Sequence, residues 1–131
     1  MLSISDPGLF RQQAFIGGAW VDADSGRVFE VNDPATGLVL GTVPALGAVE
    51  TRRAIESAAE AWPAWRARTA QDRSAVLRRL FDLVMAHQED LAQLMTAEQG
   101  KPLAEARGEI QYAASFLEWF AEEAKPTPRP C

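Results

Sequence analysis

The sequence of 131 residues lacks the features that mark secreted, disulfide-bonded and membrane-spanning proteins. It has one cysteine, Cys131, which excludes an internal disulfide framework. It has no run of about 18 apolar residues, the length that a membrane-spanning helix needs. Its first residues show no cationic stretch followed by an apolar one, so no secretory signal is expected. These absences predict a cytoplasmic protein without a membrane partner.

The sequence also lacks an excess of basic residues. Lys and Arg number 13 against 18 Asp and Glu, which gives a net charge of −5. A protein that binds nucleic acid needs a concentrated cationic surface to displace counterions, so no nucleic-acid partner is expected. Apolar residues make up 47% and charged residues 24%, as is usual for a globular protein of one domain.

Motifs for nucleotide, metal or nucleophile chemistry are missing as well. There is no Gly-x-Gly-x-x-Gly and no Gly-Lys-Ser/Thr loop. The one histidine, His87, has no partners at metal or triad spacing, and we interpret it as a helix-end residue. Lys101 is interpreted as a structural cation that offsets a helix dipole, and Cys131 as a solvated thiol. The sequence therefore predicts no catalytic, cofactor-binding or metal-ligating residue.

The N-terminal third has the composition of short strands. Residues 14–21 predict a hairpin, because the Gly17-Gly18 pair supplies the positive φ angles that tight hairpins need. Residues 27–31 and 38–43 predict two further strands, separated by the turn-forming sequence Asn-Asp-Pro-Ala-Thr-Gly. We expect antiparallel strands within about residues 14–44.

From about residue 48 the apolar residues recur at the spacing of an α-helix. The first helix is predicted to end near Pro63 and to carry its apolar face at Thr51, Ile55, Ala58 and Trp62. The second is predicted to begin at a capping box formed by Thr69 and Asp72. Its inner side is expected to hold Leu77, Leu80 and Val84. A break near His87 and a stop at Gly100 bound the third helix.

The last helix, about residues 103–124, is apolar on two sides. One face carries Ile110, Ala113, Ala114, Leu117, Phe120 and Ala121. The other carries Tyr112, Phe116 and Trp119. A helix that is apolar on two sides is usually buried on two sides, so the second face needs a partner. Residues 126–131 follow with three prolines, which favour an extended segment.

Several segments, in order, resemble the N-terminal part of the aldehyde dehydrogenase superfamily, and within it the succinate- and glutarate-semialdehyde dehydrogenases. They are residues 9–20, 32–37, 62–66, 98–103 and 118–123. The resemblance covers about residues 9–125, within residues 1–125 taken as one N-terminal segment, and a proline-rich 126–131 follows that the family pattern does not include. The expected fold class is α+β: antiparallel strands followed by a layer of three to four helices, as part of the family's α/β fold.

The resemblance carries implications for function. Such enzymes oxidise an aldehyde through a cysteine thiohemiacetal, pass hydride to NAD or NADP, and use a glutamate base. Their catalytic cysteine, glutamate and cofactor-binding units lie beyond the matched region, so we expect an N-terminal fragment that is inactive alone and binds no cofactor. By the same resemblance Tyr112 and Phe116 are expected on the wall of the substrate tunnel. The expected partner along the last helix is the remainder of the dehydrogenase fold or a second copy of the chain.

An alternative from another class stays open at this point. The stripe of Tyr112, Phe116 and Trp119 is also typical of a free-standing helical module that docks on another protein, because exposed apolar patches often mark contact surfaces.

Overall fold

A computed structural model describes residues 3–125, which form two small antiparallel strand pairs and four α-helices. In chain order the elements are η1 (Pro7–Leu9), β1 (Ala14–Ile16), β2 (Ala19–Val21), β3 (Val28–Asn32), β4 (Val39–Pro44), α1 (Ala48–Ala67), α2 (Ala70–Ala86), α3 (Gln88–Gln99) and α4 (Leu103–Glu123). The α+β prediction is confirmed. The proline-rich segment and Cys131 lie outside the described residues.

The two hairpins form where turn residues allow them. Gly17 and Gly18 have φ angles of 61° and 83° between β1 and β2, as a two-residue turn requires. Between β3 and β4 the Asp33 carboxylate accepts hydrogen bonds from the Ala35 amide at 2.8 Å and the Thr36 hydroxyl at 2.9 Å. This side chain closes the turn in the manner of an Asx turn.

The first helix corrects one prediction. α1 continues through Pro63 to Ala67 and does not end near the proline. Proline removes one backbone donor and crowds the carbonyl four residues earlier, here that of Ala59. Both residues are exposed, so water can bond the freed carbonyl.

The apolar stripe predicted on the first helix is not the face that α1 turns inward. The expected stripe is exposed, with Trp62 55% accessible, while Glu50, Ala54, Ser57 and Trp65 are buried or half-buried. The periodicity of the sequence identifies an apolar stripe on a helix, but it does not show whether other elements of the chain pack against that stripe.

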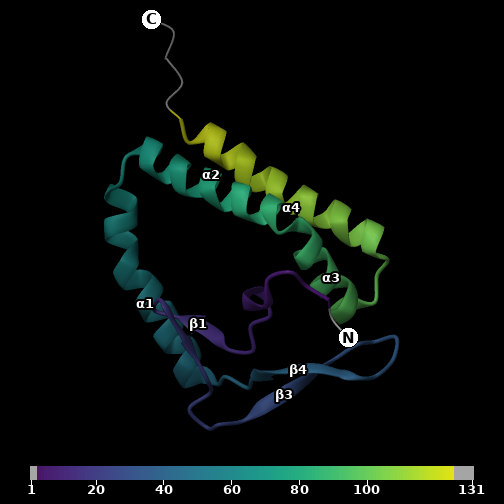
Figure 1. Cartoon of the computed structure of the whole chain (residues 1–131). Coiled ribbons are helices and arrows are strands. Elements are labelled where there is room, and N and C mark those ends of the chain that lie inside the picture. The colour runs from purple at the N-terminus through teal and green to yellow at the C-terminus, as the bar shows by residue number, and fades with distance from the viewer. Residues whose placement is uncertain (1–2, 126–131) are drawn as a thin grey trace, which may run out of the picture.

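The core lies in the layer of α2, α3 and α4. Figure 1 shows α4 lying along α2, with α3 crossing near one end of the pair. Ala106, Ala114 and Ala121 on α4 have no exposed surface, and Ile110 is buried with them. Such small side chains let the helix backbones approach closely. Leu80 and Phe120 correct the predicted core, since 44% of the first and 58% of the second are exposed.

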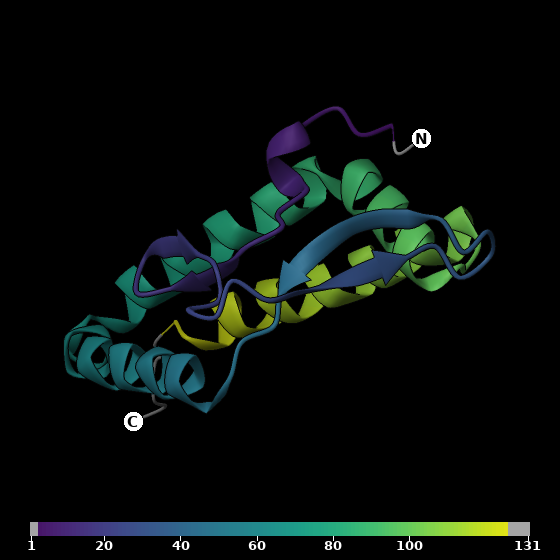
Figure 2. The ribbon, with the colours of Figure 1, turned by 90° about the horizontal axis from the view of Figure 1, so that it is seen from below.

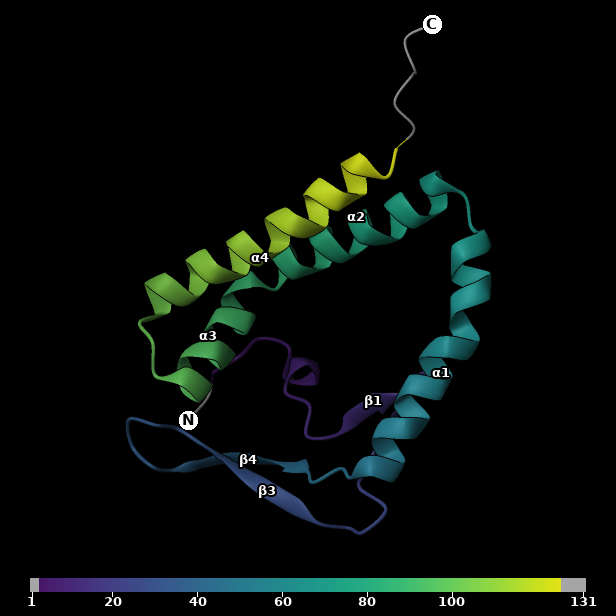
Figure 3. The same cartoon turned by 180° about the vertical axis from the view of Figure 1, so that it is seen from behind.

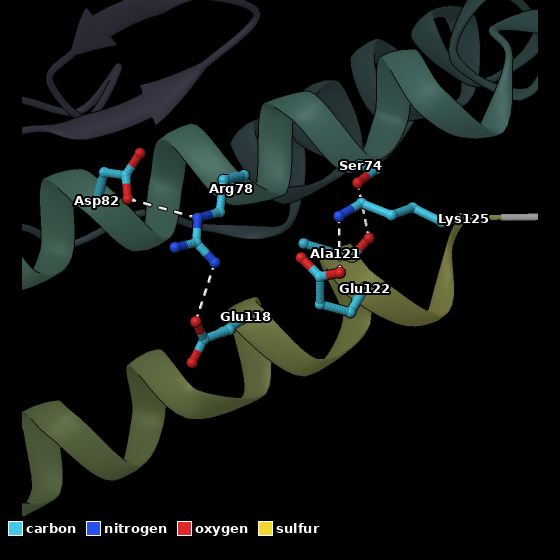
Figure 4. Close-up of polar contacts among 7 residues, drawn as sticks. All are labelled: Ser74, Arg78, Asp82, Glu118, Ala121, Glu122 and Lys125. Carbon is cyan, nitrogen blue, oxygen red and sulfur yellow. Dashed lines mark hydrogen bonds and ion pairs between the residues drawn. The ribbon is translucent and has the colours of Figure 1, made fainter.

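Polar contacts fix α4 against α2 (Figure 4). The Ser74 hydroxyl is buried and donates to the Ala121 carbonyl at 2.6 Å, near the C-terminus of α4 where carbonyls lose their helical partners. One turn along, Arg78 pairs with Glu118 at 2.9 Å. The two contacts set the register of the helix pair.

Helix ends follow local chemistry. The Thr69 hydroxyl accepts the Asp72 amide at 3.1 Å, which confirms Thr69 as the cap, but the Asp72 carboxylate accepts the Thr69 hydroxyl and does not complete the predicted capping box. His87 ends α2 and begins α3, as predicted. Gly100, with φ of 73°, ends α3 in the left-handed conformation. Within residues 3–125, no helix combines the length and apolar character needed to cross a membrane.

Candidate functional site

The feature most suited to contact a ligand or another segment is the outer face of α4. Because residues three and four apart share a helix face, Tyr112, Phe116, Trp119 and Phe120 form one exposed stripe, which we call the aromatic stripe. Tyr112 is 68% exposed. Its ring contacts that of Phe116 edge-to-face, with centroids 4.9 Å apart and planes at 78°.

Carboxylates border the aromatic stripe. Glu118, Glu122 and Glu123 line a shallow hollow of about 730 Å³ together with the four rings. Glu118 is paired with Arg78, and Glu122 with Lys125 at 2.6 Å. The hydrogen bond from Lys125 lowers the pKa of Glu122 below its ordinary value. The hollow therefore suits an apolar group, and two of its three carboxylates are paired with cations.

The structure brings the predicted site residues together. Tyr112 and Phe116 lie in contact, and Trp119 lies on the same stripe. A role as a substrate-tunnel wall stays a prediction. Sequence reasoning missed Phe120, which it placed on the buried face. Its spacing of four residues from Phe116 was the available signal.

Lys101 has a more specific role than the one predicted. Its side chain is 20% exposed and donates to the Glu109 carboxylate. Since Glu109 belongs to α4, this contact ties the α3–α4 connection to the helix that follows. Among the residues that the structure describes, no group of three or more His, Cys, Asp or Glu could hold a metal ion.

Two buried carboxylates were not predicted. Glu50 accepts the backbone amides of Gly47 and Asp24, each at 3.0 Å. Hydrogen bonds from its own amide and those of Gly47 and Asp24 lower the pKa of Glu50. Asp90 accepts the backbone amides of Ser5 and Asp6, and these hydrogen bonds lower its pKa. Each oxygen of these two carboxylates accepts a backbone amide, which gives both groups a structural role.

A second hollow, of about 610 Å³, lies away from the aromatic stripe. The N-terminal residues, the β3–β4 hairpin and α3 line it. Its walls are largely apolar, with Asp33 and Glu98 at the lining. The Asp33 carboxylate is already engaged in its own turn, which lowers its pKa through the amide of Ala35 and the hydroxyl of Thr36.

Comparison with known proteins places the chain among its relatives. The model of the aldehyde dehydrogenase family matches residues 20–128. The chain is 65% identical over 124 residues to glutarate-semialdehyde dehydrogenase of Pseudomonas aeruginosa, covering 95% of this chain and 26% of that protein. It is 60% identical over 124 residues to succinate-semialdehyde dehydrogenase (NADP+) of Escherichia coli K12, with the same coverage.

A solved structure agrees. The crystal structure of succinate-semialdehyde dehydrogenase from Burkholderia pseudomallei is 62% identical, with a TM-score of 0.91 over 96% of this chain and 28% of that one. The chain thus spans about a quarter of the length of the relatives that it matches.

Proposed function

This chain belongs to the aldehyde dehydrogenase family, and we propose that it is the N-terminal part of an NAD(P)-dependent enzyme that oxidises succinate semialdehyde or glutarate semialdehyde. The observation that carries the proposal is the identity of 65% and 60% to dehydrogenases of these two compounds, each matched over 95% of the chain. The proposal includes a cytoplasmic location, in keeping with the single cysteine of the sequence.

Within such an enzyme, we propose that the aromatic stripe is covered by the remainder of the dehydrogenase fold and that Tyr112 and Phe116 form part of the substrate-tunnel wall. The support is physical. Four adjacent rings on one helix are exposed, and water is an unfavourable neighbour for so much apolar surface. The contact of Tyr112 with Phe116 gives the proposed wall a fixed shape.

The 131-residue chain by itself is proposed to be inactive and to bind no cofactor. The chemistry of the family requires an activated cysteine, a general base and a dinucleotide site. Neither the sequence motifs nor the hollows of residues 3–125 provide these groups. The alternative of a free-standing interaction module finds no support in the comparisons, since the relatives that match nearly the whole chain are dehydrogenases.

A chimeric enzyme tests the proposal. Residues 1–125 would replace the matching quarter of the E. coli succinate-semialdehyde dehydrogenase. We expect the chimera to reduce NADP+ with succinic semialdehyde, followed as absorbance at 340 nm. A folded chimera that oxidises neither succinic nor glutaric semialdehyde would overturn the assignment.

The same chimera tests the tunnel wall. Tyr112→Ala and Phe116→Ala should raise KM for the semialdehyde by about tenfold, because each removes an apolar contact worth roughly 1.4 kcal/mol. Gln111→Ala, also exposed on α4 but outside the aromatic stripe, is the matched control and should leave KM unchanged. An unchanged KM in both ring variants would remove these residues from the tunnel.

The isolated chain gives a third measurement. Mixed with succinic semialdehyde and NAD+ or NADP+, it should produce no absorbance increase at 340 nm above a blank without protein. A rate that a thiol-blocking reagent abolishes would show that the chain carries its own nucleophile.

A further inference from the structure

We propose that the N-terminal arm, residues 3–13, is a strap that fastens the β3–β4 hairpin to α3. The arm contains the short helix η1 and leads into β1. Figures 1 and 3 show it between α3 and β1, and Figure 2 shows η1 standing above the helices. The strap holds parts of this chain together, a role separate from the proposed oxidation.

One end of the strap is held by α3. Asp90 lies in the first turn of α3 and is only 4% exposed. One of its carboxylate oxygens accepts the Ser5 amide at 2.8 Å, and the other accepts the Asp6 amide at 2.9 Å. Hydrogen bonds to a charged group are about twice as strong as neutral ones. The Asp6 carboxylate in turn accepts the Gly8 amide at 2.8 Å and begins η1.

The other end of the strap is held by the hairpin. The side-chain oxygen of Gln12 accepts the backbone amide of Thr42 in β4 at 2.8 Å. The neighbouring Gly41 permits this approach, since a Cβ there would lie 2.7 Å from the Gln12 oxygen and 2.8 Å from the ring of Phe10. A larger residue at 41 would force the Gln12 side chain or the Phe10 ring to move.

The strap also forms part of the wall of the hollow of about 610 Å³. Ile4, Pro7 and Phe10 face it from the arm, Leu38 and Leu40 from the hairpin, and Leu94 from α3. The hollow therefore lies among the three parts that the strap joins. Pro34 approaches Gly100 at the end of α3, so the turn of the hairpin has a contact of its own. Release of the strap would leave the hairpin attached by its turn and open the hollow along its strands.

Amide hydrogen exchange of the 131-residue chain tests the α3 end. In Asp90→Asn both amides lose their charged acceptor, and one of them faces the amide NH2 in place of an oxygen, so the Ser5 and Asp6 amides should exchange at least about tenfold faster. Glu89→Gln makes the same charge change one residue earlier, on a side chain that bonds Arg107, and should leave these two amides unchanged. Equal exchange in Asp90→Asn and the native chain would overturn the proposal.

The hairpin end has its own test. Gln12→Ala should speed exchange of the Thr42 amide, while Gln13→Ala, whose side chain bonds Asp22 in the other hairpin, should not. In the double variant Asp90→Asn, Gln12→Ala, amides of β3 and β4 should exchange faster while those of α2 and α4 keep their protection. If the β3 and β4 amides keep full protection there, something other than the strap fastens the hairpin and the proposal is wrong.

Discussion

Gly100 shows how much one residue decides at the junction of α3 and α4. Its φ of 73° lies in the left-handed region, which costs other residues about 1–2 kcal/mol. A Cβ at this position would also lie 2.9 Å from Cγ of Pro34. Gly100 thus ends α3 and leaves room for Pro34 in the turn of the β3–β4 hairpin. Lys101 follows immediately and bonds Glu109, which directs the chain into α4.

Gly100→Ala should therefore lower the free energy of unfolding by at least about 1–2 kcal/mol. Gly108→Ala is the matched control, because Gly108 lies inside α4 and an added methyl group would meet open space there. At that position alanine should raise stability by about 0.5–1 kcal/mol through helix propensity. Urea unfolding followed by circular dichroism measures both. The same sign of change in both variants would contradict the assigned role of Gly100.

Residue-scale features were predictable where their partners are close in sequence. The Gly17-Gly18 turn, the Thr69 cap and the Gly100 stop each depend on residues within a few positions. Asp90 was missed because its amide partner Ser5 lies 85 positions away, and the burial of Glu50 was missed because its partner Asp24 lies 26 positions away, although Glu50 also accepts the nearby Gly47 amide. No local pattern distinguishes such a carboxylate from a solvated one, since only the fold brings the amides to it.

At the scale of the helix, the two faces of α4 have different roles. The inner face carries Ala106, Ala114 and Ala121 and packs on α2 and α3, while the outer face carries the aromatic stripe. The two-faced pattern was predicted, because the 3.6-residue period is a property of sequence. The place of Phe120 and the exposure of the α1 stripe were not, since the period does not tell which face the available neighbours cover.

Truncation of one side chain on each face of α4 should lower stability by different amounts. Ile110→Ala removes a buried side chain from the core cluster with Ala92 and Ala106, and should cost about 2–5 kcal/mol of stability. Phe116→Ala removes a half-exposed ring and should cost much less in the isolated chain. Thermal or urea unfolding of both variants compares them. Equal losses would show that the aromatic stripe is part of the core of this chain.

On the scale of the whole molecule, carboxylates that accept amides or cations join distant segments. Asp33, Glu50, Glu89, Asp90 and Glu122 all have pKa values below their ordinary ones. The bond from Arg107 is the main cause for Glu89, and backbone amides are the main cause for Glu50 and Asp90. Asp90 connects the arm to α3, Glu50 connects residue 24 to α1, and Glu89 connects α3 to α4, whereas Asp33 and Glu122 bond residues two or three positions away.

Acid should weaken the fold through these groups. A carboxylate whose pKa is lower in the folded state stabilises the fold above its unfolded pKa, and this stability is lost as pH falls through the folded pKa. The loss should therefore begin below about pH 4.5, the ordinary value for Glu, and continue below 3.8, that for Asp. Urea unfolding at stepped pH measures it. Glu50→Gln should flatten the dependence, and a stability independent of pH below 4.5 would contradict the prediction.

The inner face of α4, with its buried Ala106, Ala114 and Ala121, affects how the chain behaves in concentrated solution. Small methyl groups lie on the inner face of α4 and the rings of the aromatic stripe lie on its outer face. The most apolar surface of the helix is therefore in contact with solvent. Crowding of molecules then buries rings that folding leaves bare. High concentrations of the chain therefore favour association through the aromatic stripe.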